Sequence, residues 1–240
     1  MPSFEHAGAS IHYEIVGEGF PVVVFAPGGM RSTISFWDSA PWDPRRELAG
    51  QFRVVAMDQR NAGSSTAPVR SGDGWDSYAA DHLALLDHLG IDRCHVMGGC
   101  IGSSYCLGVM QAAPERVAAA VLQNPIGLAD NRSAFHEMFD GWADEIRVQQ
   151  PEVADEVWTA FRDRMYGGDF VFNLSRDFVR SCQTPILILA GADLYHPAQI
   201  SREIAELAPQ AELIERWQEP DAVADTVKRV QSFLVAHTPV

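Results

Sequence analysis

A glycine-flanked cysteine between an apolar run and a helical pattern most constrains how this chain folds. The run at 95–97 leads into GGCIG over residues 98–102, and a segment with helical character follows. A sharp turn from strand to helix strains the backbone of its central residue, and side chains two positions away on either side would collide there. Gly98 and Gly102 remove those collisions, so the pattern predicts a tight strand–turn–helix unit with the Cys100 thiol at its apex.

The rest of the chain alternates short apolar runs with helical periods. The expected strands cover residues 4–6, 11–15, 21–25, 52–57, 95–97, 117–123, 185–190 and 211–215. The expected helices between and after them cover residues 77–89, about 103–113 and 221–236. Such alternation implies right-handed crossovers and a mainly parallel sheet, and the strand-only start implies an antiparallel edge. We therefore predict an α/β fold with a central sheet of about eight strands and helices on both faces.

The alternation breaks between residues 127 and 181. This segment is rich in aromatic residues and reads as helices without a strand. We expect it to form a short helical lid above the C-terminal edge of the sheet, where open α/β sheets bind their ligands. The chain has no internal repeat, low-complexity run or linker-like stretch, so residues 1–240 are expected to form one domain.

The position of Cys100 makes its thiol a candidate nucleophile. At a helix N-terminus the dipole and the free N–H groups favour a thiolate, which lowers the pKa of the cysteine and makes its sulfur reactive. The competing interpretation is a small buried hydrophobic residue, as free cysteines often are. Cys94, Cys106 and Cys182 lack these surroundings and are expected to be structural, and no CxxC pair offers a structural zinc site.

Several motifs, in the same order along nearly the whole chain, resemble the α/β-hydrolase superfamily. GGCIG resembles the nucleophile elbow of that superfamily, with cysteine where most relatives carry serine. The run FAPGGM at 25–30 stands where the superfamily has its oxyanion loop, although Ala26 replaces the usual histidine. DQRNAGSS at 58–65 resembles the D-x-R-G-x-G-x-S stretch. GAD at 191–193 follows the run at 185–190, where relatives carry the acidic member of the catalytic triad.

The resemblance implies acyl transfer or related carbonyl chemistry, with no metal and no organic cofactor. Cys100 would attack a carbonyl carbon, and two backbone N–H groups would bind the resulting oxyanion. Ile101 would supply one N–H, and Gly28 or Gly29 the other, because Pro27 has none. A glycine-rich loop can instead cradle a phosphate, but this one lacks the lysine and the spacing of a P-loop.

The catalytic histidine of the superfamily has no counterpart in its usual place. That place is the loop between the last strand and the last helix, which reads ERWQEP at 215–220, and His237 lies about four turns farther on. Asp193 is expected in the acid position, with a turn-forming aspartate as the competing interpretation. His196 is the best-placed substitute base, unless it only precedes a helix or His136 of the lid takes that role. A thiol needs a base less than a hydroxyl does, so we interpret the cysteine at the elbow and the absent histidine as linked.

Charge and composition exclude several classes of partner. The chain has 32 acidic and 18 basic residues, and its formal net charge of -14 repels phosphate backbones and anionic membranes. No stretch reaches the roughly 18 apolar residues that span a bilayer, and the start MPSFEHAGAS lacks the features of a signal peptide. We expect a cytoplasmic protein with a small-molecule carbonyl substrate and no nucleic-acid or membrane partner; formation of a homodimer stays open.

These observations predict a cofactor-free hydrolase that acts through Cys100 on a small ester, lactone or thioester, whose leaving groups need the least acid assistance. Dienelactone hydrolases also use an elbow cysteine, which favours a lactone, and hydrolysis of a C–C bond in a small diketone stays open. The absent histidine supports a second interpretation, a non-hydrolytic protein that binds a ligand or acts as a lyase or cyclase. A binding or scaffold protein without catalysis is the third.

Overall fold

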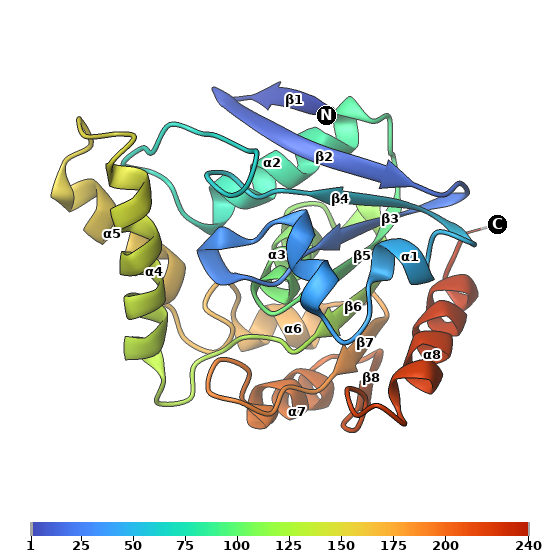
Figure 1. Cartoon of the computed structure of the whole chain (residues 1–240). Coiled ribbons are helices and arrows are strands. Elements are labelled where there is room, and N and C mark those ends of the chain that lie inside the picture. Colours follow the sequence, from blue (N-terminus) through green and yellow to red (C-terminus); the bar gives the residue numbers. More distant parts are fainter. Residues whose placement is uncertain (1, 240) are drawn as a thin grey trace.

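Eight strands form one sheet in the order β1-β2-β4-β3-β5-β6-β7-β8 in the computed structural model, which describes residues 2–239 (Figure 1). The strands are β1 (Ser3–His6), β2 (Ala9–Val16), β3 (Phe20–Phe25), β4 (Phe52–Met57), β5 (Cys94–Gly99), β6 (Val117–Gln123), β7 (Ile186–Leu189) and β8 (Ala211–Ile214). β1 pairs antiparallel with β2, and β2 pairs antiparallel with β4. Every pairing from β4 to β8 is parallel, so the predicted mostly parallel sheet with an antiparallel edge is confirmed.

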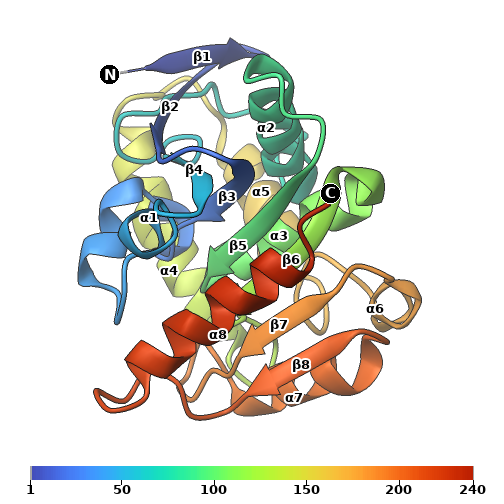
Figure 2. The same ribbon diagram turned by 90° about the vertical axis from the view of Figure 1, so that its right-hand side faces the viewer.

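Helices cover both faces of this sheet. They are α1 (Pro44–Glu47), α2 (Trp75–His88), α3 (Ile101–Ala112), α4 (Arg132–Arg147), α5 (Asp155–Tyr166), α6 (Arg176–Ser181), α7 (Ala198–Leu207) and α8 (Val223–Ala236). Three short 3-10 helices are η1 (Gly29–Arg31), η2 (Ile34–Ser39) and η3 (Pro114–Arg116). Figure 2 shows α8 lying across the strands on one face. None of the helices within residues 2–239 is long and apolar enough to pass through a bilayer.

The alternation of side chains along each strand divides the core into two layers. In β3, Val23 and Phe25 point into the larger layer, which also receives the apolar faces of α2, α3 and α7. Val22 and Val24 point the other way, into the layer covered by α1 and α8. Because successive side chains of a strand face opposite sides, an apolar run that is not interrupted by polar residues is the pattern of a strand buried on both faces.

The elements agree closely with the pattern of the sequence. β4 and β6 begin and end at the predicted residues, and the other strands differ from prediction by three residues or fewer at each end. α3 begins at Ile101, two residues earlier than predicted, because Cys100 itself is the residue at which the helix starts. Between β6 and β7 the chain forms α4, α5 and α6, and α4 packs against both α5 and η1.

Candidate active site

The turn between β5 and α3 holds Cys100 in a strained conformation. Its backbone has φ 58° and ψ −123°, in the left-handed half of the map that residues with a side chain rarely adopt. Its flanking glycines are required, since a Cβ at Gly98 would overlap the backbone of Gly102, and a Cβ at Gly102 would overlap the carbonyl of Phe25. The turn therefore places the thiol at the N-terminus of α3, as the glycine pattern predicts.

The surroundings of Cys100 favour a thiolate. Burial acts to raise the pKa of the thiol, but His196 and the backbone N–H groups of Ile101 and Gly28 outweigh it, and the pKa lies below its ordinary value. Two of the expected oxyanion donors, Ile101 and Gly28, thus contribute to the lowered pKa of the thiol and line the same cavity. Gly29 lines the same cavity.

Two of the other cysteines differ sharply from Cys100. Burial raises the pKa of Cys94 to about 12 and raises the pKa of Cys106 well above its ordinary value. A thiol that stays protonated is a poor nucleophile. Cys182 is also buried.

Asp193 and His196 lie in the loop between β7 and α7, and their side chains interact directly. His196 Nδ1 is 2.8 Å from Oδ1 and 2.9 Å from Oδ2 of Asp193. Oδ1 also accepts the backbone N–H groups of Tyr195 and His196 itself, at 2.9 and 3.0 Å. These contacts fix the carboxylate and orient the imidazole, so that Nδ1 carries a proton and Nε2 faces away from the acid.

The imidazole and the Cys100 thiol stabilise each other's charged forms. Burial acts to lower the pKa of His196, but Cys100 and then Asp193 raise it to about 9. Burial likewise acts to raise the pKa of Asp193, and His196 lowers it below its usual value. His196 Nε2 is buried and makes no hydrogen bond to the other residues of the 2–239 range, so it is free to exchange a proton with a group in the cavity.

The other candidate histidines lie elsewhere. His136 is on α4, outside the residues that line the cavity at Cys100, and burial lowers its pKa. His237 follows α8 and its Nδ1 is 2.8 Å from the carbonyl oxygen of Phe233. In the loop where the family usually has its histidine, Trp217 is buried and donates its indole N–H to Ala190 O at 2.8 Å. That loop is therefore structural.

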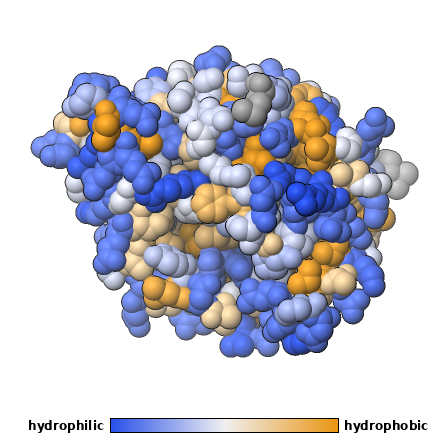
Figure 3. Space-filling view, viewed as in Figure 1, coloured by the Kyte–Doolittle hydropathy of each residue, from blue (hydrophilic) through white to orange (hydrophobic). Residues whose placement is uncertain are grey.

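A cavity of about 240 Å³ opens onto the thiol. Its walls are Gly28, Gly29, Cys100, Ile101, Ile126, Phe135, Met138, Tyr166, Tyr195 and His196. Apart from the Cys100–His196 pair, none of these lining side chains carries a charge at neutral pH. On the face drawn in Figure 3, hydrophobic residues lie in several separate patches among hydrophilic ones. The site is thus a small apolar chamber with one reactive pair at its base.

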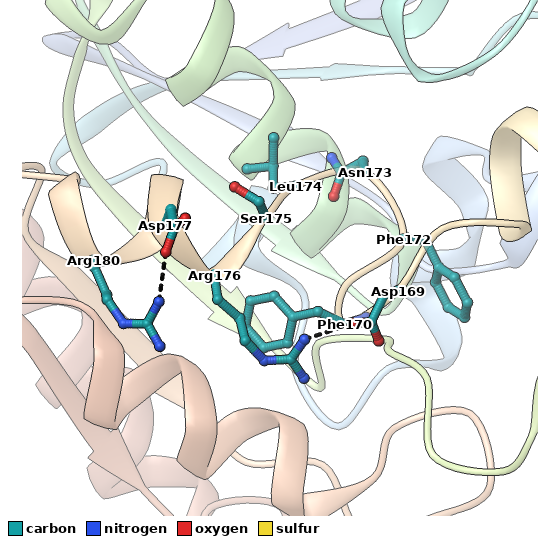
Figure 4. Close-up of a pocket in the computed structure, with 9 residues that line it drawn as sticks. All are labelled: Asp169, Phe170, Phe172, Asn173, Leu174, Ser175, Arg176, Asp177 and Arg180. Carbon is teal, nitrogen blue, oxygen red and sulfur yellow. Dashed lines mark hydrogen bonds and ion pairs between the residues drawn. The ribbon is translucent and has the colours of Figure 1, made fainter.

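A larger groove of about 490 Å³ runs beside α6 and offers no comparable chemistry (Figure 4). Its two arginines are neutralised by carboxylates: Arg176 pairs with Asp169 and Glu203, and Arg180 pairs with Asp177. The groove has no cysteine or histidine in its lining. We therefore place the candidate active site at Cys100.

Two structural devices brace the oxyanion loop. Ser32, fully buried, donates its hydroxyl to Ala26 O at 2.7 Å, and its own carbonyl accepts the N–H of Gln59 at 3.0 Å. This contact holds the loop in place of the missing histidine at position 26. Asp58 accepts the N–H groups of Ile34 and Ser64, both at 2.8 Å, and so anchors the following loop.

Arg60, two residues after Asp58, is structural as well. Its guanidinium is buried and forms ion pairs with Asp81 at 2.8 Å and with Asp73 at 3.1 Å. Neither Arg60 nor these two carboxylates line the cavity at Cys100. Within residues 2–239 no group of three or more His, Cys, Asp or Glu side chains is arranged to hold a metal ion.

Comparison with known proteins agrees with this fold. A family model described as "alpha/beta hydrolase fold" matches residues 21–180 of the 240. A putative carbamate hydrolase, RutD, of Variovorax paradoxus is 32% identical over 114 residues, which cover 48% of this chain and 42% of that protein. A probable proline iminopeptidase of Leptolyngbya boryana is 30% identical over 176 residues, which cover 67% of this chain and 51% of that protein. The matched segments thus span about half or less of these relatives.

The likeness of fold extends over the full length. A meta-cleavage product hydrolase from Pseudomonas fluorescens IP01 has a TM-score of 0.73 at 21% identity, with 99% of this chain and 98% of that one covered. Together with the sheet order and the turn at Cys100, the family match over residues 21–180 shows that the chain belongs to the alpha/beta hydrolase fold family.

Proposed function

We propose that this protein is a hydrolase whose Cys100 thiolate attacks the carbonyl carbon of a small uncharged ester, lactone or thioester. The observation that carries the proposal is the position of His196, which contacts Asp193 through Nδ1, lines the same cavity as Cys100 and lowers the pKa of the thiol. Nucleophile, base and orienting acid are thereby aligned although the last loop has no histidine.

The proposed reaction begins with the ion pair. The sulfur of Cys100 forms a bond to the carbonyl carbon, and the electron pair of the C=O bond moves onto oxygen, where the N–H groups of Ile101 and Gly28 stabilise it. When the tetrahedral intermediate collapses, the bond to the leaving group breaks, and His196 Nε2 gives its proton to the departing alkoxide or thiolate. The product of this half is a thioester on Cys100.

Acylation also prepares the second half. The acylated sulfur carries no charge, so His196 loses the partner that contributes most to its raised pKa and becomes a neutral base. Nε2 then takes a proton from water as the water oxygen attacks the thioester carbon. Collapse releases the carboxylic acid and regenerates the thiolate, while Asp193 stabilises the imidazolium.

The chamber supports a small uncharged substrate. At roughly 30 Å³ for each water-sized group, a cavity of about 240 Å³ holds roughly eight non-hydrogen atoms. Ile126, Phe135 and Met138 offer only apolar contacts, and burying an unpaired charge among them would be costly. The names of the two relatives, a carbamate hydrolase and an iminopeptidase, agree with a hydrolytic role.

We further propose that residues 127–181 act as a lid within a single domain. Phe135 and Met138 of α4 and Tyr166 at the end of α5 supply one wall of the chamber, which supports this role. The alternative of a non-hydrolytic ligand-binding protein, lyase or cyclase rests on the missing histidine. The placement of His196 weakens that argument, and hydrolysis is the function that we favour.

The proposal is tested with p-nitrophenyl esters and small alkyl thioesters. Wild type should hydrolyse them, and Cys100→Ala should lower kcat/KM by about three orders of magnitude. The matched control is Cys182→Ala, which removes a buried thiol that does not line the cavity and should leave the rate near that of wild type. Acylation of Cys100 should appear in the mass spectrum of a quenched reaction. Turnover that survives in Cys100→Ala would rule out covalent catalysis by this residue.

A further inference from the structure

Asn131 stands immediately before α4, at the N-cap position, but its side chain does not cap the helix. Asparagine is among the preferred residues at this position because its side-chain oxygen can accept a free N–H group of the first turn. Here the side chain makes no hydrogen bond to that turn. A buried side chain that does not make its usual capping hydrogen bond makes a different contact instead. Such departures from local preference concentrate at functional sites.

The side chain of Asn131 reaches instead to the loop that carries Asp193 and His196. Its Nδ2 donates to the carbonyl oxygen of Leu194 at 2.6 Å and to that of Gly127 at 3.1 Å. Its Oδ1 accepts the backbone N–H of Ala129 at 2.9 Å. The amide is buried and its N–H groups and oxygen are all engaged, so it forms a rigid bridge between two backbone segments.

The bridge meets the loop at Leu194, between Asp193 and His196. The side chain of Leu194 is 59% exposed and so anchors nothing. On one side, Ser201 Oγ accepts the N–H of Gly191 at 3.1 Å, and on the other the ring of Tyr195 packs on Phe135 with centroids 5.3 Å apart. Between them, Asn131 provides the only side-chain hydrogen bond to Leu194 among the described residues. Figure 1 shows the first turn of α4 at the end of that helix nearer to α7.

We propose that Asn131 is a positioning residue, which holds the Asp193–His196 loop so that the imidazole faces the Cys100 thiol. It touches neither the cavity nor the thiol and acts through the backbone of Leu194. Since α4 also carries Phe135 and Met138, the same bridge ties the wall of the chamber to the loop with the base. This inference rests on the proposed function, because it assigns Asn131 a role in keeping that nucleophile charged.

A charge measurement on Cys100 tests the role without any substrate. The groups that face the thiol are His196, with Asp193 behind it, Tyr105 of α3 and Tyr166. Burial raises the pKa of both tyrosines well above the ordinary value, so they stay neutral through the range tested. A change in the thiol's titration below pH 9 therefore reports on the imidazole.

The experiment measures the rate at which iodoacetamide alkylates Cys100 from pH 5 to 10, with the site located by mass spectrometry. In Asn131→Ala the rate at pH 7 should fall about tenfold, and its pH midpoint should move toward the ~8.5 of free cysteine. Asn131→Ser should behave alike, since the serine hydroxyl is too short for the bridge, although serine is also a preferred residue at the start of a helix. The control is Asn173→Ala, which removes the hydrogen bond of a half-buried amide, from Nδ2 to Ser104 O at 2.7 Å, and should keep the wild-type midpoint.

The possible results separate the two proposals. If the alkylation midpoint of Cys100 is low in wild type and unchanged in folded Asn131→Ala and Asn131→Ser, the positioning role is overturned and the proposed function stands. A wild-type midpoint near that of free cysteine overturns the proposed function and, with it, the need for positioning. If neither variant folds, as judged by circular dichroism and thermal unfolding, Asn131 serves the fold and the positioning role is overturned. Only a selective upward shift in the Asn131 variants supports it.

Discussion

His196 Nδ1 lies 2.8 Å from Oδ1 of Asp193, three residues earlier in the same loop. Both side chains therefore come from the single connection between β7 and α7. The connection between β8 and α8 supplies no side chain to the site, and its buried residue, Trp217, packs into the core. The orientation of the base depends on one short segment and on the contacts that hold it. This local arrangement gives the following predictions.

The rate should follow a bell-shaped pH profile. The lowered pKa of Cys100 makes the thiolate available above that pKa, and the raised pKa of His196 keeps the imidazolium protonated up to about 9. Both charges coexist only between these limits. For an alkyl ester, whose leaving alkoxide needs a proton, kcat/KM should rise on the acid side and fall as pH passes about 9. A rate that keeps climbing above pH 9, in protein shown to be folded there, would exclude His196 as the proton donor.

Asp193→Asn should lower kcat by about a hundredfold with little change in KM, because the carboxylate acts on the charge and orientation of the imidazole and does not line the chamber. The thiol pKa should rise in parallel, since a less charged imidazole stabilises a thiolate less. The comparison is Asp177→Asn, which removes an exposed carboxylate paired with Arg180. Equal activity of the two variants would remove Asp193 from the mechanism.

Gly102→Ala should destabilise the fold by about 1–3 kcal/mol or more, because the added Cβ overlaps the backbone carbonyl of Phe25. Gly72→Ala is the matched control, since a Cβ at Gly72 meets nothing within 4 Å. Urea unfolding followed by circular dichroism gives both free energies. If Gly102→Ala is as stable as Gly72→Ala, the turn at Cys100 is looser than the structure indicates.

The chamber should discriminate against a charged acyl group. 4-Nitrophenyl butyrate and mono-4-nitrophenyl succinate have chains of equal length, and kcat/KM for the succinate should be lower by about a hundredfold, because no lining side chain can pair with its carboxylate. Met138→Lys introduces a cation into the wall and should recover part of that loss. Comparable rates for both esters in wild type would show that the acyl group does not enter this chamber.

The sequence predicts the sheet and the turn because their signals are local. Buried strands such as β4 and β6 are continuous apolar runs, and the turn needs glycine two residues before and after Cys100 for steric reasons that depend on nearby backbone only. Asp193 and His196 are proposed from the sequence because they stand three apart after a strand, and the structure shows that their side chains contact each other.

The remaining parts of the site depend on contacts between distant segments. The approach of His196 to Cys100 joins two loops almost a hundred residues apart in the chain, and no periodicity reports it. Asn131 looks like an ordinary helix start, and only the structure shows its side chain turned toward Leu194. Ser32 is likewise unremarkable in sequence, although it holds Ala26 where a histidine is usual.

Trp217 has a consequence for how the protein can be altered. Its indole N–H bonds to Ala190 O, so the last loop is tied to the end of β7 by packing and one hydrogen bond. In the proposed enzyme, the groups that react all precede residue 197 in the chain, and everything after it serves as scaffold. A second protein fused beyond α8 should therefore affect turnover only through stability, whereas changes at Ser201 or Trp217 would also reach the loop that carries the base.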